Sequence, residues 1–270
     1  MDPEVKPIRH RLLDDIEILL HGVPCRSSRG WLGYCSIVLF PLEDGLALFD
    51  TGHFSDRFLL LEVLKERALN PSDIKYVFVS HLHFDHILNI PLFRNASLKV
   101  AKAEVEYARR VVAGEIDDPS IPENWESILA GHEVELIDGA VRIDDRTELE
   151  VLPGHTPGGL VVYRRGQGNV AICGDVIKNA MDAAGGEATA VGLDAASAGS
   201  SIRHILEKAR VIVPGHDRPF FLHNDVLEFL SPFNWRIRGN LMPGKQDEIM
   251  LDVNLPLAVL DLPWSRFSGQ

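Results

Sequence analysis

Short apolar runs of strand length alternate along this chain with longer stretches in which hydrophobic residues recur at helical spacing. The run CSIVLFPL is followed by Glu43-Asp44-Gly45 and then by LALFD, a pattern typical of two strands joined by a hairpin turn. YVFVS, which ends directly before His81, has the composition of a buried strand. The first half therefore predicts strands at 35–42, 46–50 and 76–80, and helices at 58–67, 102–112 and near 125–130.

The second half repeats the alternation and predicts strands at 148–152, 160–164, 169–173 and 211–214, and helices at 202–209 and 225–230. The stretch 180–201 is rich in Ala, Gly and Ser and is either a mobile loop or a helix with loose ends; its length and composition favour the loop.

Prolines in the last forty residues favour an extended tail with a strand at 247–254. Its aromatic residues either pack back onto the body of the protein, which we favour, or cover a subunit interface or the site: Phe233, Trp235, Trp264 and Phe267. No linker divides the chain, so we expect one domain over residues 1–270, with about 231–270 as a C-terminal extension packed on it.

The two halves also echo one another. In the first half, a strand that ends in Asp50 is followed by a helix and by a strand that leads to His81. In the second half, Asp175 and His216 take the same places. Two similar halves of this kind suit a fold whose site lies where their strand ends meet.

Composition and charge narrow the classes of function. Hydrophobic residues make up 46% and charged residues 24% of the 270, as in ordinary globular proteins. The formal net charge of −12 disfavours nucleic acid and anionic membranes as partners and suits a neutral or weakly charged small molecule. Three cysteines without C-x-x-C spacing argue against a disulfide framework or a cysteine zinc site. With no apolar signal region and no membrane-length apolar run, we expect a soluble, cytoplasmic protein.

Residues 81–86, His-Leu-His-Phe-Asp-His, place three imidazoles and a carboxylate directly after a buried strand. Neutral imidazole nitrogen and carboxylate oxygen are suitable zinc ligands. A turn at the strand end can aim His81 and His83 at one metal ion, and Asp85 and His86 at a neighbouring one. A lone histidine in such a turn is usually a surface residue, but four ligand-type side chains in six positions favour a metal site.

Three further candidates each follow a glycine in a turn after a strand, namely His155 in PGHTPGG, Asp175 in CGD and His216 in PGHD. Glycine permits sharp turns and close approach of the backbone. Each of the three alone is readily explained as a turn residue. Because the glycine recurs before all three, a common site is the better interpretation.

In this order and spacing, the motifs HxHxDH, GHT, GD and PGH, with DTG at 50–52, resemble the metallo-β-lactamase superfamily over roughly residues 16–220. The resemblance implies an α/β (α+β) fold, a four-layer αββα sandwich with the site at one rim of its paired sheets. It also implies a dinuclear centre: His81, His83 and His155 for the first metal ion, Asp85, His86 and His216 for the second, and Asp175 as the bridge. Asp50 resembles the aspartate that orients a ligand histidine in this family.

The resemblance further implies two divalent ions, with zinc as the default and iron or manganese as alternatives that nitrogen and oxygen ligands also accept. Such a pair shares a hydroxide that attacks the substrate at neutral pH. Either Asp85 or Asp175 would pass the proton onward, and the spacing does not decide between them. His53, three residues after Asp50, lines the substrate pocket or is an exposed turn residue.

Several hydrolase classes share this ligand set. The complete set, the motif SHLHFDH and the acidic charge favour hydrolysis of a carboxylic ester or lactone, such as an acyl-homoserine lactone. The stretch HILNIPLF departs from the usual lactonase form and resembles the branch named metallo-β-lactamase domain-containing protein 1, which leaves a nuclease or phosphodiesterase as an alternative. A glyoxalase II-like thioesterase is a third option. A non-enzymatic scaffold is disfavoured because all seven ligand positions are filled, and a homodimer is compatible with the family analogy.

Overall fold

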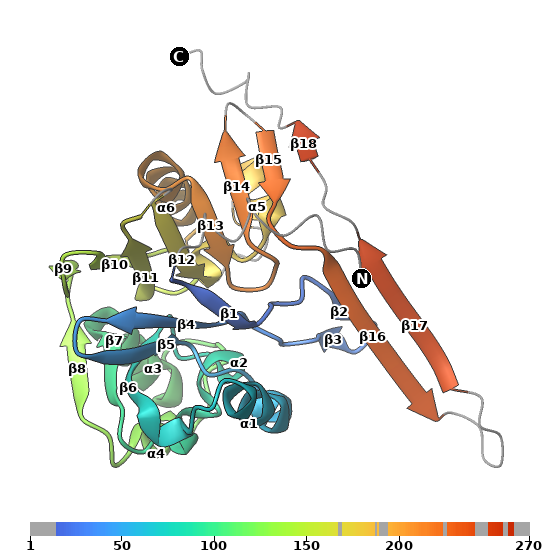
Figure 1. Cartoon of the computed structure of the whole chain (residues 1–270). Helices are drawn as coiled ribbons and strands as arrows, with labels where there is room; N and C mark the ends of the chain where they lie inside the picture. The colour runs from blue at the N-terminus through green and yellow to red at the C-terminus, as the bar shows by residue number, and fades with distance from the viewer. Residues whose placement is uncertain are drawn as a thin grey trace, which may run out of the picture.

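The computed structural model describes residues 15–166, 169–186, 188, 194–223, 226–240, 248–255 and 259–261. Within them, two large sheets pack against each other, as Figure 1 shows. The first sheet contains, in spatial order, β1 (Glu17–Leu20), β4 (Ile37–Leu42), β5 (Gly45–Phe49), β6 (Ile74–Val79), β7 (Ser97–Ala101) and β8 (Val134–Ile137). The second contains β18 (Val259–Asp261), β15 (Val226–Phe229), β14 (Phe220–His223), β13 (Val211–Pro214), β12 (Val170–Gly174), β11 (Gly159–Arg164), β10 (Thr147–Leu152) and β9 (Ala140–Arg142).

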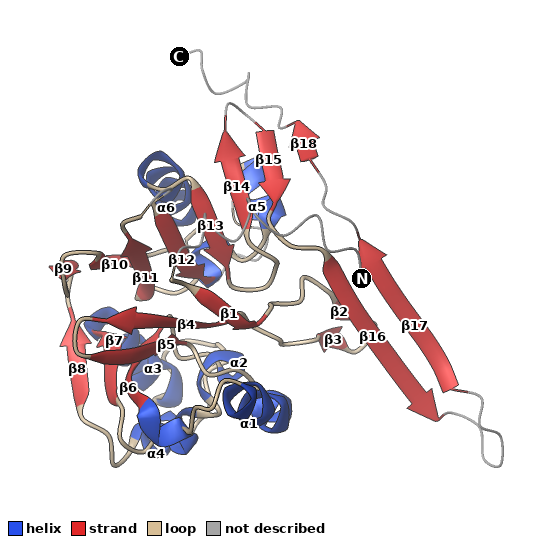
Figure 2. Ribbon diagram, viewed as in Figure 1, coloured by secondary structure: helices blue, strands red, loops and turns tan. Residues whose placement is uncertain are grey.

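Helices cover the outer face of each sheet (Figure 2). The first sheet is covered by α1 (Arg57–Glu66), α2 (Phe84–Ile87), α3 (Lys102–Val112) and α4 (Trp125–Leu129), and the second by α5 (Ala180–Gly185) and α6 (Ala195–Lys208). Short 3-10 turns are η2 (Phe54–Asp56), η3 (Pro71–Asp73), η4 (Ile90–Leu92) and η5 (Asp175–Ile177). Two small two-stranded sheets complete the described chain: β2 (Arg26–Ser27) with β3 (Gly30–Trp31), and β16 (Phe233–Asn240) with β17 (Glu248–Leu255).

Alternate residues of the central strands face different layers, which explains why these strands are apolar on both faces. In β6, Phe78 lies in the core between the two sheets, whereas Val77 and Val79 lie under the helices. In β12, Ile172 lies between the sheets and Cys173 faces α5 and α6. The four-layer αββα sandwich expected from the sequence is confirmed.

Two expectations for the second half were wrong. The stretch 180–201 is not a loop throughout, because it contains α5 and the first part of α6. The side chain of Asn179 accepts hydrogen bonds from the first turn of α5, and that of Asp194 does so for α6. These caps satisfy backbone groups at each helix start, which outweighs the loop preference of the small residues. The helix expected at 225–230 is instead strand β15, since its backbone pairs with β14 and β18.

The C-terminal residues contribute to more than one sheet. The strand expected at 247–254 is confirmed as β17, which pairs only with β16 among the described strands, and β18 forms an edge of the second large sheet. Phe233 is buried and Trp235 half-buried, whereas Trp264 and Phe267 lie outside the described residues. The division of the chain into one domain with an extension stays a prediction.

None of the described helices combines the length and the apolar character needed to cross a bilayer. The cytoplasmic location stays a prediction.

Replacing Leu64 with Ala tests the packing of α1 on the first sheet. Leu64 is completely buried, so Leu64→Ala leaves a cavity and should lower the free energy of unfolding by about 2–5 kcal/mol. The matched control is Leu136→Ala, because Leu136 in β8 is 48% exposed and its loss should cost less than about 1 kcal/mol. Urea unfolding followed by circular dichroism measures both, and equal losses would contradict the layer assignment.

Candidate metal centre

The candidate ligands are carried by the carboxyl ends of strands from both sheets. In the first sheet, β5 and β6 are parallel; Asp50 follows β5 directly, and His81 comes two residues after β6. In the second sheet, β12 and β13 are parallel; Asp175 follows β12 directly, and His216 comes two residues after β13. Parallel strands end at the same edge of a sheet. The corresponding strand ends of the two halves therefore lie along one shared rim of the sandwich.

The structure brings all seven candidate ligands together. One group of ligand atoms belongs to His81, His83 and His155, with His155 Nε2 3.2 Å from His83 Nδ1. A second group belongs to Asp85, His86 and His216, with His216 Nε2 3.3 Å from Asp85 Oδ2. Within each group the ligand atoms lie within 4.8 Å of one another.

Asp175 lies between these two groups. Its Oδ2 is 3.4 Å from His155 Nε2, and its Oδ1 is 3.3 Å from His216 Nε2 and 3.5 Å from His86 Nε2. A carboxylate that reaches both groups has the position needed to bridge two metal ions. The assignment of individual ligands to each ion stays a prediction.

Several atoms that face this cluster are buried and have no hydrogen-bond partner among the described residues: Nε2 of His81, His86 and His216, and Oδ1 of Asp175. Burial, reinforced by the neighbouring His86 and His83, holds the pKa of His81 well below its usual range, so its imidazole is neutral. A neutral imidazole nitrogen with a free lone pair is a metal ligand, and unpartnered buried polar atoms are costly without one. The residues therefore fit divalent metal ions.

Contacts on the outer side of each ring decide which nitrogen faces the cluster. His86 Nδ1 lies 2.7 Å from Asp50 Oδ2, and His216 Nδ1 lies 2.9 Å from the carbonyl oxygen of Tyr34. A proton held on these outer nitrogens leaves Nε2 free to ligate. Asp50 itself adopts a left-handed backbone conformation, with φ of 59°, and its other oxygen accepts from the backbone N–H of Ser80. Asp50 thus occupies the orienting position that the resemblance implied.

Sequence reasoning missed Asp118, which orients His83. Asp118 Oδ2 lies 2.9 Å from His83 Nε2 and accepts a hydrogen bond of 2.7 Å from the hydroxyl of Tyr107. Burial opposes ionisation of Asp118, but the hydrogen bonds from His83 and Tyr107 hold its pKa below the usual range. Asp118 follows another aspartate in a polar loop 32 residues after His86, so nothing local distinguishes it.

Glu104, in the first turn of α3, was also missed. Its completely buried carboxylate accepts from the backbone N–H of Leu82 at 2.9 Å and from that of Gly158 at 3.2 Å. It therefore ties the loop that carries His81 and His83 to the loop that carries His155. The sequence did contain a pattern that could have identified Glu104 as buried. Glu104 is four residues before Ala108 and so lies on the buried face of the expected helix.

Lys178 places a positive charge at the cluster. Its ammonium is 2.8 Å from Asp175 Oδ2 and 5.0 Å from the ring centre of Trp31, whose side chain is half exposed. Burial opposes the charge on Lys178, but Asp175 outweighs burial and raises its pKa. The sequence analysis overlooked this lysine, although it comes only three residues after Asp175.

The side chains of His53 and Asn89 form hydrogen bonds with the backbone of the loop that follows Asp50, next to the ligand cluster. The His53 ring accepts from the backbone N–H of Ser55 and packs edge-on against Phe84, with ring centres 5.6 Å apart. Its role in a substrate pocket stays a prediction. The buried Asn89 amide donates to the backbone oxygens of Thr51 and His53, so the departure from the lactonase form in HILNIPLF supports the DTG loop from inside.

The family model described as the metallo-beta-lactamase superfamily matches residues 30–216. An N-acyl homoserine lactonase of a Bacillus species is 28% identical over 164 residues, covering 58% of this chain and 62% of the lactonase. The metallo-beta-lactamase domain-containing protein 1 of Mus musculus is 29% identical over 209 residues, covering 71% of this chain and 72% of the mouse protein. A metallo-beta-lactamase structure from Thermotoga maritima aligns with a TM-score of 0.62 at 21% identity, covering 77% of this chain and 99% of that one.

Asp118→Asn tests whether this residue orients His83. Asparagine keeps the size but removes the negative charge that holds the outer proton of His83, so affinity for divalent metal should fall about 10–100-fold. Competition with a chromophoric zinc chelator measures the affinity. Asp117→Asn is the matched control, because Asp117 is exposed and adjacent in sequence. Unchanged affinity in Asp118→Asn would show that His83 is held without this carboxylate.

Proposed function

The chain belongs to the metallo-β-lactamase superfamily, and from this premise we propose that it is a dinuclear metallo-hydrolase of carboxylic esters or lactones of the acyl-homoserine lactone type. The observation that carries the proposal is the convergence of seven buried or half-buried ligand side chains, with Asp175 between two groups of three. The lactonase relative supports the substrate class, at 28% identity.

Two divalent ions, zinc by preference and iron or manganese as alternatives, would be held by His81, His83, Asp85, His86, His155, Asp175 and His216. When bound, the ions supply a water whose pKa is lowered to about 7 and positive charge for the carbonyl oxygen under attack.

Lys178 and Asp85 have positions from which they can assist the reaction. The ammonium of Lys178 stands beside Asp175, where it can stabilise the negative charge that develops on the carbonyl oxygen and the carboxylate of the product. One carboxylate oxygen of Asp85 accepts the proton that the attacking water gives up. The Asp85 side chain is 11% exposed, whereas that of Asp175 is 2% exposed. Asp175 is surrounded by His155, His216 and Lys178. Asp175 thereby serves to hold the centre together.

The surroundings of the cluster favour a neutral acyl substrate over a phosphodiester. Two aromatic side chains lie near the cluster: Trp31, which is 50% exposed and contacts the Lys178 ammonium, and Phe84, which precedes Asp85 and packs against His53. The overall charge of −12 repels a polyanion. The alternative that the family resemblance leaves open, a nuclease or phosphodiesterase, would use the same ligand set, so the experiment includes it.

A paired assay on a metal-quantified preparation tests the function. We expect about two zinc ions per chain by mass spectrometry and hydrolysis of an acyl-homoserine lactone, with turnover reduced more than 100-fold in Asp175→Ala. The same preparation is tested on bis-p-nitrophenyl phosphate and on S-lactoylglutathione. Phosphodiester or thioester turnover without lactone turnover would replace the proposed substrate class, and a single iron ion with no hydrolysis would overturn the dinuclear interpretation.

Lys178→Met tests the role of the ammonium. Methionine keeps much of the apolar stem but removes the charge, so kcat on the lactone should fall about 100-fold because the lost interaction forms mainly in the transition state. Metal content should stay at the wild-type value. Lys102→Met, an exposed lysine in α3, is the matched control. A change in KM alone would assign Lys178 to substrate binding instead.

A further inference from the structure

A cavity of about 630 Å³ lies next to the metal centre, and the proposed reaction does not use it. Its walls come from β1 and the residues after it, from the segment before β4, from η2 and α1, and from the turns before β14 and after β15. Pockets that bind small molecules typically have volumes of roughly 300–1,000 Å³. The described lining includes none of the seven candidate ligands, and it includes neither Lys178 nor Trp31. We call this space the β1–α1 cavity.

The β1–α1 cavity lies on the outer side of the second ligand group. The carbonyl oxygen of Tyr34, a residue of the cavity wall, accepts from Nδ1 of His216 at 2.9 Å and from the backbone N–H of Val23 at 3.0 Å. Gly22 is packed so closely that an added Cβ would lie 2.6 Å from Cα of His216. Because Nε2 of His216 faces the other ligands, a molecule in the cavity would be separated from the ligand atoms by this wall.

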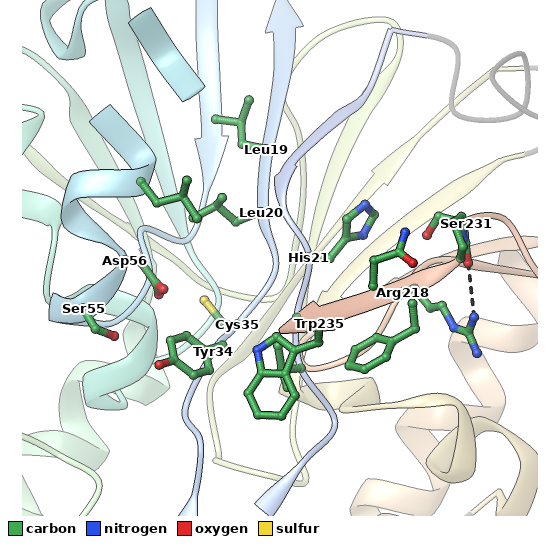
Figure 3. A pocket seen from close by; sticks show the side chains of 16 residues that line it. Leu19, Leu20, His21, Tyr34, Cys35, Ser55, Asp56, Arg218, Ser231 and Trp235 are labelled. Carbon is green, nitrogen blue, oxygen red and sulfur yellow. Dashed lines mark hydrogen bonds between the residues drawn. The ribbon is translucent and has the colours of Figure 1, made fainter. Parts of the chain in front are cut away.

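Most of the cavity wall is apolar. Leu19 and Leu20 of β1, Leu59 of α1 and the half-buried Trp235 all line it. Figure 3 shows Leu19, Leu20 and Trp235 around the same space. Leu59 is 49% exposed, so its side chain lies where the cavity meets solvent. An aliphatic chain that enters would remove its own surface and that of these residues from water, which is favourable.

One side of the cavity carries a fixed positive charge. The guanidinium of Arg218 donates to the carbonyl oxygen of Ser231 at 3.4 Å and lies 3.8 Å from the ring centre of Phe229. The neighbouring Asp217 carboxylate accepts from the backbone N–H groups of Ala180 and Arg218. A guanidinium stays protonated in proteins and binds carboxylates with a favourable planar geometry. Arg218 therefore supplies a charged anchor in a largely apolar pocket.

The charges of the cavity are arranged along one direction. In Figure 3, His21 and Ser231 lie on the same side as Arg218, whereas Asp56 lies on the opposite side. The buried carboxylate of Asp56 accepts from the backbone N–H of His53 at 3.0 Å. An elongated ligand with a negative group at one end would place that group beside Arg218. A second negative group at its other end would meet Asp56 and be repelled.

We propose that the β1–α1 cavity is a second ligand site, which binds a small amphiphile with a single carboxylate, of the medium-chain acyl carboxylate type. The carboxylate lies against the guanidinium of Arg218, and the aliphatic chain lies along Leu20 and Leu59. The ligand is not a reactant and contacts none of the candidate metal ligands. This inference therefore goes beyond the proposed hydrolysis and does not rest on it.

Titration of the metal-quantified full chain with octanoate tests the site. Calorimetry should show saturable binding of octanoate. Octan-1-ol, which keeps the chain but lacks the charge, should bind about tenfold more weakly or worse, because it loses a hydrogen bond to a charged group. Octanoate that fails to saturate the protein at millimolar concentration would overturn the proposal. Equal affinity for the alcohol would also overturn it, because the charge would then not be recognised.

Two tryptophans report where octanoate binds. Trp235 lines the cavity, whereas Trp31 contacts Lys178 beside the metal centre. Binding should change the tryptophan fluorescence of the wild type. Trp235→Phe should lose this change while calorimetry still detects binding, and Trp31→Phe, the matched control, should retain it. A fluorescence change that is lost only in Trp31→Phe would place octanoate at the metal centre and overturn the proposal.

Two substitutions in the wall test the expected contacts. Arg218→Gln removes the positive charge, and Leu59→Asp adds a negative charge at the mouth of the cavity. Each should weaken octanoate binding by about tenfold or more. Arg203→Gln is the matched control, because Arg203 is an exposed arginine of α6 outside the described lining.

Circular dichroism shows whether each variant is folded. Leu59→Asp keeps the test decisive if the buried Arg218 is needed for folding, because Leu59 is half exposed. Wild-type affinity in both wall variants would overturn the proposal. Metal content and lactone hydrolysis are measured separately, so failure of the second site is distinguishable from failure of the proposed function.

Discussion

The rest of the structure depends on one constraint: three buried imidazole nitrogens and one carboxylate oxygen face the same cluster without a hydrogen-bond partner among the described residues. Leaving such an atom unpartnered costs about 1–3 kcal/mol, so the surrounding fold has to hold the cluster together. Asp50, Asp118 and the Tyr34 carbonyl oxygen do this from outside by occupying the other nitrogen of three rings. Metal ions are the partners that such a cluster fits.

The sandwich makes this possible because its two sheets contribute strand ends to one rim. Parallel pairs β5–β6 and β12–β13 deliver Asp50, His81, Asp175 and His216 from opposite layers. Glu104 then connects loops that come from different sheets, through two backbone N–H groups. The relative position of these two ligand loops therefore depends on how the two sheets pack against each other.

The sequence alone determined the layer order of the fold, through its family resemblance, and all seven candidate ligands, because these follow short apolar strands at local, readable spacings. The family resemblance, through its DTG motif at 50–52, also singled out Asp50. Only the tertiary structure revealed the contacts of Glu104, Asp118 and Lys178, and it replaced the expected helix at 225–230 with a strand. For Glu104 and Asp118 the physical reason is that their partners are distant in sequence and are selected by packing and hydrogen bonding in three dimensions. Lys178 is only three residues from its partner Asp175, but sequence spacing does not fix whether two side chains at a turn point toward each other.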